Sequence, residues 1–284
     1  MIGASTRLVA LLGNPVSHSL SPRIQNAAFR ALSVDGVYVA LRCEESDVPG
    51  LVRGIARAGG AGNITLPHKE IAARTVDHPS ELVRRTGACN TFWLENGLVH
   101  GENTDVAGFR GAVEALIGRS AKGLRVLLLG AGGSARGALE GLLADGVGEA
   151  WVWNRTPDRA RALVAVANDP RVSALDSLGA MAGEPLDLIV NATSLGLRDS
   201  DSLPIDLSEV AEPGALLDLV YRPAETPLVR FARTLGIPAA DGGEMLVRQG
   251  AEAFRLWWGH PAPLQVMQEA MAGSRTAGAG AAGG

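Results

Sequence analysis

Short apolar runs alternate with segments of helical periodicity along most of this 284-residue chain. Parallel strands need long crossover connections, usually helices, so this alternation is typical of βαβ units and not of a sandwich or a helical bundle. The sequence therefore predicts the α/β class. Strands are expected over residues 7–13, 37–43, 62–66, 125–130, 150–154, 186–192 and 215–220.

The chain is predicted to form two domains with a cleft between them. An Asn96-Gly97 pair predicts a β-hairpin, and a helix with an apolar stripe then begins near Thr104 and leads to a second set of strands. The helices expected over 243–258 and 264–271 have no strand after them, so we expect them to return to the first domain. The assignments are 1–103 with 243–272 for the first domain, 104–242 for the second, and 273–284 for a disordered tail with almost nothing apolar to bury.

The composition excludes several classes of protein and partner. Hydrophobic residues make up 46% of the chain and charged residues 20%, as in a folded globular protein, and the net charge of −4 offers no positive field to nucleic acid or to an anionic membrane. The early apolar run at 8–12 is far shorter than the roughly 20 residues that span a bilayer. Cys43 and Cys89 are too few for a disulfide framework or a thiolate metal site. We expect a cytoplasmic protein with reduced thiols, no metal and no membrane segment.

A glycine-rich turn follows the strand expected at 125–130. The segment Leu127-Leu-Leu-Gly-Ala-Gly-Gly-Ser-Ala135 has the pattern of a buried strand, a G-x-G-x-x-A turn and the start of a helix. Gly130 permits the tight turn, Gly132 lets the backbone approach a pyrophosphate, and the small Ala135 allows the helix to pack closely on the strand. This context favours a Rossmann dinucleotide site over a merely tight turn. The residues expected to bind are Gly130, Ala131, Gly132, Gly133, Ser134 and Ala135.

The end of the next strand indicates which dinucleotide binds. An acidic residue at that place accepts hydrogen bonds from a ribose 2′-hydroxyl, whereas a 2′-phosphate needs cations. This chain has Asn154 there, followed by Arg155, Thr156 and, one turn later, Arg159. Such a group can neutralise and hydrogen-bond a phosphate, so NADP is favoured. The alternative is that both arginines are solvated charges beside a helix start.

Polar residues also collect at two strand ends of the first domain. Asn63 and Thr65 alternate on one face of the strand at 62–66, and Lys69, one of only two lysines beside 24 arginines, follows them. After the strand at 7–13, Ser21 suits the N-cap of a helix, whereas Ser19 has no capping role and could present a hydroxyl to an anionic substrate. A ligand crevice is expected at such strand ends. The alternative is a solvated strand end followed by a turn.

A carboxylate near the domain junction completes the candidate site. Asp105 lies where the helix near Thr104 begins, and helix capping alone would explain the polar residues at that place. The other interpretation pairs Asp105 with Lys69 and orients the amine for proton transfer. The sequence does not show whether the two side chains meet.

Seven ordered motifs together resemble the shikimate dehydrogenase family over roughly residues 8–270. The motifs are His18-Ser-Leu-Ser-Pro22, Asn63-Ile-Thr-Leu-Pro-His-Lys69, Gly87-Ala-Cys-Asn-Thr91, Asn103-Thr-Asp105, Gly130-Ala-Gly-Gly133, Asn154-Arg-Thr156 and Met245-Leu-Val-Arg-Gln249. The resemblance implies an N-terminal substrate domain, an NADP-binding Rossmann domain, and the reversible NADPH-dependent reduction of 3-dehydroshikimate to shikimate. Cys89 and His68 differ from the residues that are usual in the family motifs, at positions without an assigned role.

The resemblance also implies a role for each site residue. Lys69 is the acid/base and Asp105 is its partner, while Ser19 and Ser21 hold the substrate carboxylate. The residues implied for the ring hydroxyls are Asn63, Thr65, Asn90, Asp105 and Gln249. Tyr221 is implied as a further substrate contact, and Leu219 and Gly242 as contacts of the bound cofactor.

Two other functions stay open at this stage. Relatives that act on quinate or on an amino analogue of shikimate share most of these motifs, and a non-catalytic NADP-binding sensor would keep the fold without turnover. The sequence does not distinguish a monomer from a homodimer. The expected partners are the small-molecule substrate and the cofactor.

Overall fold

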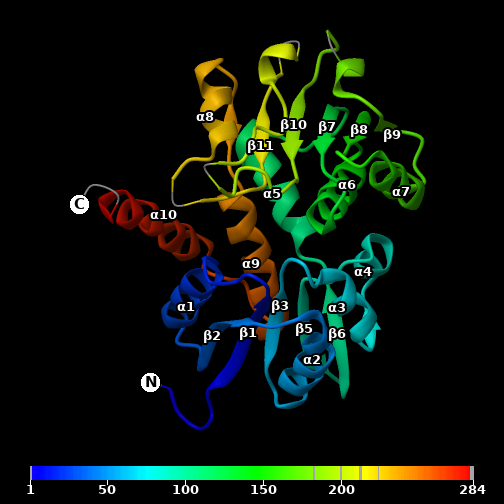
Figure 1. Cartoon of the computed structure of the whole chain (residues 1–284). Helices are drawn as coiled ribbons and strands as arrows, with labels where there is room; N and C mark the ends of the chain where they lie inside the picture. Colours follow the sequence, from blue (N-terminus) through cyan, green and yellow to red (C-terminus); the bar gives the residue numbers. More distant parts are fainter. Residues whose placement is uncertain (1, 182, 199, 211–212, 223, 282–284) are drawn as a thin grey trace. The chain divides into compact units, whose positions relative to one another are not determined.

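The computed structural model of the chain describes residues 2–181, 183–198, 200–210, 213–222 and 224–281. Contacts divide the chain into unit 1, Met1–Gly108 with Leu246–Thr276, and unit 2, Phe109–Met245 with Ala277–Gly284. Each unit is built on its own sheet (Figure 1), and each sheet has six strands. The predicted α/β class is therefore confirmed. The unit boundaries lie a few residues beyond the ones we expected at 103/104 and 242/243.

The sheet of unit 1 is mixed. Its strands are β1 (Arg7–Gly13), β2 (Gly36–Arg42), β3 (Ala61–Ile64), β4 (His78–Pro79), β5 (Thr91–Glu95) and β6 (Leu98–Glu102). They lie in the order β2-β1-β3-β5-β6-β4. β1 is parallel to β2 and β3, and β4 is parallel to β6, whereas β5 is antiparallel to both of its neighbours. The predicted hairpin between β5 and β6 is confirmed, because Asn96 and Gly97 both adopt the positive φ that a two-residue turn needs.

The last helices pack on the start of unit 1. The helices assigned wholly or mostly to this unit are α1 (Ser21–Ala31), α2 (Val48–Arg57), α3 (Lys69–Thr75), α4 (Glu81–Thr86), α9 (Gly243–Trp258) and α10 (Leu264–Ala281), with a 3₁₀ turn at Glu45–Asp47. In α1, Gln25 Nε2 donates to the carbonyl of Gly250 in α9 at 2.8 Å. The rings of Phe29 and Trp258 meet edge to face, with centroids 5.5 Å apart. These contacts tie α9 to α1.

The sheet of unit 2 is parallel throughout. Its strands are β7 (Arg125–Leu129), β8 (Glu149–Trp153), β9 (Val172–Leu175), β10 (Leu188–Asn191), β11 (Leu216–Asp218) and β12 (Ala239–Ala240), in the order β12-β11-β10-β7-β8-β9. The helices are α5 (Asp105–Ile117), which begins in unit 1, α6 (Gly133–Asp145), α7 (Pro157–Ala167) and α8 (Pro227–Thr234), with 3₁₀ turns at Leu178–Met181 and Leu207–Glu209. Strands buried on both faces explain continuous apolar runs such as that of β7.

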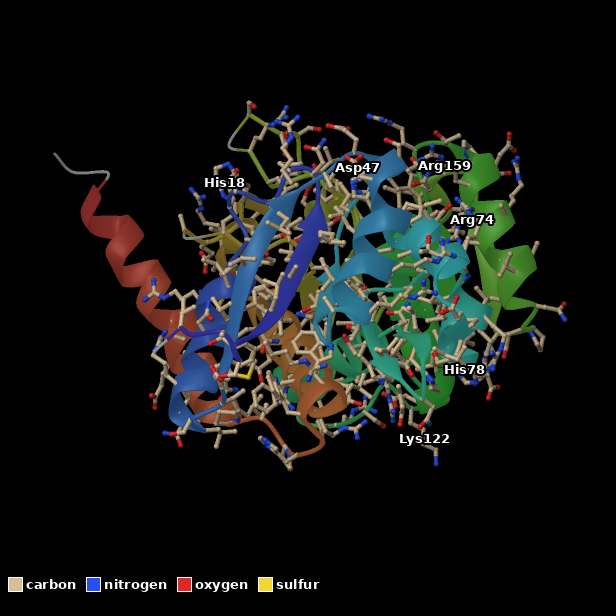
Figure 2. All side chains as sticks on the ribbon, turned by 90° about the horizontal axis from the view of Figure 1, so that it is seen from below. His18, Asp47, Arg74, His78, Lys122 and Arg159 are labelled. Carbon is tan, nitrogen blue, oxygen red and sulfur yellow. The ribbon has the colours of Figure 1, made fainter. Side chains whose placement is uncertain are left out.

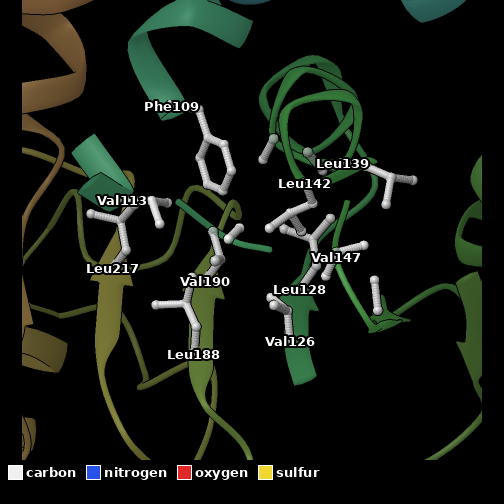
Figure 3. Close-up of a cluster of buried hydrophobic side chains, with 14 of the residues drawn as sticks. Phe109, Val113, Val126, Leu128, Leu139, Leu142, Val147, Leu188, Val190 and Leu217 are labelled. Atoms are coloured by element: carbon white, nitrogen blue, oxygen red, sulfur yellow. The ribbon is translucent and has the colours of Figure 1, made fainter. Parts of the chain in front are cut away.

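A close-packed core lies between α5, α6 and this parallel sheet. Figure 3 shows Phe109 from α5 and Leu142 from α6 beside the strand residues Leu128 and Val190, and all four side chains are buried. The packing leaves no spare volume at Gly141, where a Cβ atom would lie 2.8 Å from Phe109 Cδ1. The core thus fixes where β7 ends and α6 begins.

Several segments differ from the sequence expectations. β4 and β12 are two residues each, too short to show a period of two, and β9 was also not predicted. Residues 273–281, expected in a disordered tail, continue α10 to Ala281, because extending an existing helix needs no new nucleus. Residues 282–284 of that tail lie outside the described residues. Within the described ranges, no helix combines the length and apolar character needed to cross a bilayer.

The close contact of β3 with its neighbours yields a stability prediction. A Cβ atom at Gly62 would lie 2.4 Å from the Ala10 carbonyl oxygen and 2.6 Å from Phe92 Cε1. We expect Gly62→Ala to destabilise the protein by about 3 kcal/mol or more, because backbone and a core ring must both move. Gly54→Ala, in an open position on α2, should stabilise it by about 0.5–1 kcal/mol. Calorimetric unfolding midpoints would test this, and equal midpoints for the two variants would contradict it.

Candidate active site

The candidate residues of unit 1 follow two parallel strands that are direct neighbours. β1 and β3 pair with Leu12 opposite Ile64, so both strands end at the same edge of the sheet. The loop after β1 carries Ser19 and Ser21, and the loop after β3 carries Thr65 and Lys69. The topology therefore brings the two polar segments predicted from the sequence to one edge.

Lys69 and Asp105 meet. The Lys69 ammonium donates to Asp105 Oδ2, and the two side chains are only 15% and 7% exposed. Lys69 is the first residue of α3 and Asp105 the first residue of α5, so the N-terminal end of α5 also stabilises the carboxylate. The other lysine, Lys122, is exposed, and Figure 2 shows its nitrogen pointing away from the ribbon. Among the described residues, Lys69 is therefore the lysine that is held against an acid.

Asn90 holds the second oxygen of that carboxylate. Its Nδ2 donates to Asp105 Oδ1 at 2.8 Å, and its Oδ1 accepts from the backbone N–H of Thr104 at 2.8 Å. Gln249 Oε1 lies at the outer limit of a hydrogen bond, 3.5 Å from Asn90 Nδ2. Each oxygen of Asp105 thus faces its own donor, which leaves the carboxylate little freedom to rotate.

Asn63 links this group to the core of the sheet. Its Nδ2 donates to the Asn90 carbonyl at 3.1 Å and to Thr91 Oγ1 at 2.8 Å, and its Oδ1 accepts from the Tyr38 hydroxyl at 2.8 Å. Because a carbonyl oxygen can only accept, these contacts fix which end of the amide is the nitrogen. Sequence reasoning missed Tyr38. The available signal was a tyrosine inside an apolar strand, since a buried hydroxyl needs a partner.

The two serines differ from the capping roles that the sequence indicated. We expected Ser21 to be the N-cap of α1 and Ser19 to have no capping role. In the structure α1 already begins at Ser21, and Leu20 occupies the N-cap without a side-chain bond. Ser19 Oγ accepts from the Ser21 backbone N–H at 3.2 Å instead. The expectation was wrong because the helix starts one residue earlier than Pro22 suggested.

The two cysteines and the histidine beside Lys69 have structural contacts: Cys89 Sγ donates to the Thr91 carbonyl at 3.3 Å. Burial raises the pKa of the Cys89 thiol to about 12, and burial also raises the pKa of Cys43, so both thiols stay protonated and unreactive. His68 is buried, and its Nε2 lies 2.9 Å from the Cys43 carbonyl oxygen. These residues tie the loop after β2 to the start of α3.

In unit 2, the glycine-rich loop leaves β7 in the geometry predicted for it. Gly130 has a φ of 110°, and a Cβ atom there would lie 2.9 Å from the carbonyl oxygen of Ala192. Gly132 is the extended N-cap of α6, with no side-chain cap and open space where a Cβ would project. Gly133 and Ser134 begin the helix, Ala131 lies between the glycines, and Ala135 is fully buried in the core. The first N–H groups of α6 therefore face an open, uncapped position suited to an anion.

The polar group after β8 lies beside this loop. Leu129 pairs with Trp153, and Gly130 N donates to the Trp153 carbonyl at 2.7 Å, so Asn154 directly follows the strand next to the loop. Asn154 Nδ2 donates to the Thr156 carbonyl at 2.9 Å. Arg155 and Arg159 are exposed, and the position of Arg159 can be followed in Figure 2. Thr156 is the N-cap of α7, but its hydroxyl makes no capping bond.

The remaining predicted residues belong to unit 2. Leu219 N donates to the Asn191 carbonyl at 2.8 Å, and a Cβ atom at Gly242 would lie 2.2 Å from the Leu219 carbonyl oxygen. Tyr221, half-buried, follows on the same segment. The structure thus groups Leu219 with Gly242, whereas Tyr221 is on a different unit from the other predicted substrate residues.

Family comparisons cover most of the chain. Residues 11–92 match the shikimate dehydrogenase substrate binding domain, residues 113–197 match shikimate / quinate 5-dehydrogenase, and residues 242–272 match the shikimate 5′-dehydrogenase C-terminal domain. The NADP(+) shikimate dehydrogenase of Rubrobacter xylanophilus is 41% identical over 280 residues, which cover 96% of this chain and 98% of that protein.

Solved structures agree with these matches. Shikimate 5-dehydrogenase from Thermus thermophilus, solved in complex with NADP(H) and shikimate, has a TM-score of 0.86 and 39% identity, covering 95% of this chain and 100% of that one. Shikimate dehydrogenase from Aquifex aeolicus has a TM-score of 0.88 and 32% identity, covering 95% and 99%. With identity of this size over nearly the full length of both chains, the protein belongs to the shikimate dehydrogenase family.

Proposed function

We propose that the protein is an NADP-dependent shikimate dehydrogenase in which Lys69 is the proton donor and acceptor and Asp105 orients it. The observation that carries this proposal is the Lys69–Asp105 pair at the carboxyl edge of the unit 1 sheet. In the reductive direction, a hydride is added to the ring carbonyl carbon of 3-dehydroshikimate and a proton to the carbonyl oxygen, which gives shikimate. The oxidation runs through the same groups in reverse.

Lys69 supplies what the carbonyl oxygen needs in this reaction. An ammonium beside that oxygen stabilises the negative charge that develops there and then delivers the proton. Asp105 orients the ammonium, and Asn90 keeps Asp105 from turning. The paired groups are mostly excluded from water, which strengthens their electrostatic effect. The chain's contribution to the chemistry is therefore a fixed, charged proton donor.

The residues of unit 2 fit NADP. The cofactor supplies the hydride when it is bound. The open position at Gly132 and the uncapped N-terminus of α6 suit the diphosphate, for which Gly130, Ala131, Gly133, Ser134 and Ala135 shape the loop. Asn154, Arg155, Thr156 and Arg159 are proposed to hold the 2′-phosphate, and Leu219 and Gly242 to lie beside the nicotinamide. Neither Arg155 nor Arg159 forms an ion pair with a described residue, so both guanidinium groups are available to a phosphate.

The substrate contacts proposed for unit 1 use the loops at the same sheet edge. Ser19 and Ser21 would bind the carboxylate, and Asn63, Thr65, Asn90 and Gln249 the ring hydroxyls, with Tyr221 of unit 2 as a further contact. The amide N–H groups of Asn63 and Asn90 already donate hydrogen bonds to neighbouring protein atoms. In this arrangement Asn63 offers a ligand its remaining oxygen lone pair, so it would accept a hydrogen bond from a substrate hydroxyl.

A second substrate is favoured by one observation, the match of residues 113–197 to shikimate / quinate 5-dehydrogenase. Quinate carries the same carboxylate and an additional ring hydroxyl, so discrimination depends on one donor or acceptor in the substrate pocket. Comparing kcat/KM for shikimate and for quinate with NADP⁺ would decide between the two substrates. A non-catalytic sensor would need a broken acid/base pair, and this chain has an intact one.

Replacing the proposed proton donor should remove most of the activity. We expect Lys69→Ala to lower kcat by about 10²–10⁴-fold, with a smaller change in KM, because proton transfer loses its positioned group. Lys122→Ala, which removes the other and exposed lysine, should leave both constants unchanged. Steady-state assays with shikimate and NADP⁺ provide the measurement. An unchanged kcat in Lys69→Ala would exclude this lysine from the mechanism.

Adding a negative charge at the proposed phosphate site should alter cofactor preference. We expect Asn154→Asp to lower kcat/KM for NADP⁺ by about tenfold or more, because a carboxylate repels the 2′-phosphate. The value for NAD⁺ should change much less. The matched control is Asn168→Asp, which adds the same charge at the far end of α7 at an exposed position. The ratio of kcat/KM for the two cofactors measures the effect. Equal ratios in the two variants would show that the phosphate binds elsewhere.

A further inference from the structure

A buried carboxylate lies at the cofactor edge of unit 2 without a role in the proposed reaction. Asp218 is the last residue of β11 and is fully buried, and it pairs with Asn191, the last residue of β10. Sequence reasoning missed it. Both residues lie at the carboxyl end of parallel strands, where the ligands of doubly wound sheets bind.

Three donors converge on the Asp218 carboxylate. Oδ1 accepts from Asn191 Nδ2 at 2.8 Å and from the Val220 backbone N–H at 3.1 Å, and Oδ2 accepts from Thr226 Oγ1 at 2.7 Å. Thr226 is the N-cap of α8, and its oxygen accepts from Val229 N at 3.3 Å, so its hydrogen is directed at Asp218. One ionised side chain therefore joins the loop after β10, the loop after β11 and the start of α8.

The loop after β10 connects the Asp218 cluster with the glycine-rich loop through direct contact. Asn191 Oδ1 accepts from both the backbone N–H and the hydroxyl of Thr193, at 3.1 and 2.7 Å, which shapes a tight turn. That turn lies directly against Gly130, where a Cβ atom would be 2.9 Å from Ala192 O and 3.2 Å from Thr193 N. A shift of Asn191 would therefore move the backbone on which the dinucleotide loop rests.

The loop after β11 is held from the same carboxylate. The Val220 N–H bond fixes the chain directly beside Leu219, and Gly242 N donates to the Val220 carbonyl at 3.0 Å. The close contact of Gly242 with the Leu219 carbonyl leaves no room for independent movement of either segment. The two residues proposed for the nicotinamide side of the site thus share one anchor with the turn under Gly130.

We propose that Asp218 is a positioning residue for the cofactor: its carboxylate holds the loops after β10 and β11 in the arrangement that binds the dinucleotide. The inference rests on the proposed function, because the ligand is taken to be NADP. Asp218 is not proposed to touch the cofactor, and its effect passes through Asn191 and Val220.

The ionisation of Asp218 gives this role a measurable signature. Burial and, to a smaller extent, the nearby Asp241 carboxylate raise the pKa of the Asp218 carboxyl to about 6, although the three hydrogen bonds lower it. Arg222, a further charged residue on the loop after β11, places its guanidinium 3.5 Å from the Gly196 carbonyl oxygen. All three partners donate to the ionised carboxylate, so a proton bound there removes the negative charge that strengthens these hydrogen bonds. Cofactor affinity should therefore fall as the pH drops through about 6.

Folding stability should respond to pH in the opposite direction. A carboxyl whose pKa is higher in the folded state binds more protons when folded, so this group stabilises the fold more as the pH falls from about 6 toward its unfolded value near 4. A loss of affinity on acidification therefore cannot be explained by general destabilisation through the same group. On acidification, cofactor affinity should fall while the contribution of Asp218 to folding stability rises. This difference in sign distinguishes a positioning role from a merely structural one.

The test is the dissociation constant of NADP⁺ for the full-length protein, measured by calorimetric titration from pH 5 to 8. Asp218→Asn keeps the shape and the acceptor oxygen but places an N–H against Thr226, which imitates the protonated carboxyl at every pH. We expect about tenfold weaker binding than wild type at pH 7.5 and a difference below about twofold at pH 5. The 2′-phosphate of the ligand titrates in the same way with both proteins. The ratio of the two dissociation constants therefore reports the effect of Asp218 alone.

Asp145→Asn is the matched control. Asp145 ends α6, its side chain is buried, and it accepts bonds from Arg110 Nε and from the Ala121 N–H, far along the helix from the glycine loop. This variant should bind NADP⁺ as wild type does at each pH. Thr226→Val, which removes one donor and leaves the carboxylate, should weaken binding by about two- to fivefold and serves if Asp218→Asn does not fold.

Two results would overturn the inference. One is wild-type affinity in folded Asp218→Asn, or in Thr226→Val where that variant replaces it, at pH 7.5. The other is a ratio between wild type and Asp218→Asn that stays constant with pH. Failure of the wild-type protein to bind NADP⁺ at all, or to oxidise shikimate, would instead contradict the proposed function.

Discussion

The buried pairing of Lys69 with Asp105 is the interaction on which the candidate site depends. Taking an ammonium and a carboxylate out of water costs several kcal/mol per ion, and only partners in fixed positions offset it. Here the N-terminus of α5 and the Asn90 amide stabilise the carboxylate, while Asp105 stabilises the amine. Asn90 is in turn held by Asn63 and by Thr91 of β5, so the geometry of the pair follows from that of the sheet. A charge pair held in this way has little freedom to separate.

Both units use the same geometric rule for different chemistry. In unit 1, parallel β1 and β3 end together and present serines, a threonine and a lysine. In unit 2, parallel β7, β8 and β10 end together and present backbone N–H groups, glycines and arginines. The first set suits a small polar ligand and proton transfer, and the second suits an anion approached by backbone. The apolar interiors of the strands hold these edges rigid, since each element has one buried arrangement.

Local patterns explain which parts of the structure could be predicted. The first strand, 7–13, and the Asn96-Gly97 hairpin depend on side chains within a few residues, and both are confirmed. The cap of α1 was misassigned because the sequence placed the helix start at Pro22, whereas the backbone already turns into the helix at Ser21. The tyrosine at position 38 signals a buried hydroxyl but not its partner, which lies 25 residues away along the chain. Asp218 carries no such local signal, and its partner Asn191 lies 27 residues away.

The sequence by itself determined the α/β class, the glycine loop that leaves β7, and which residue types carry the chemistry, because those depend on periodicity, turn preference and side-chain identity. Tertiary structure alone decided that Lys69 and Asp105, 36 positions apart, meet, and that Asn90 and Asp218 each hold several segments together. Strand order and register set such distances, and they result from burying whole sheets at once. No single stretch of chain contains that information.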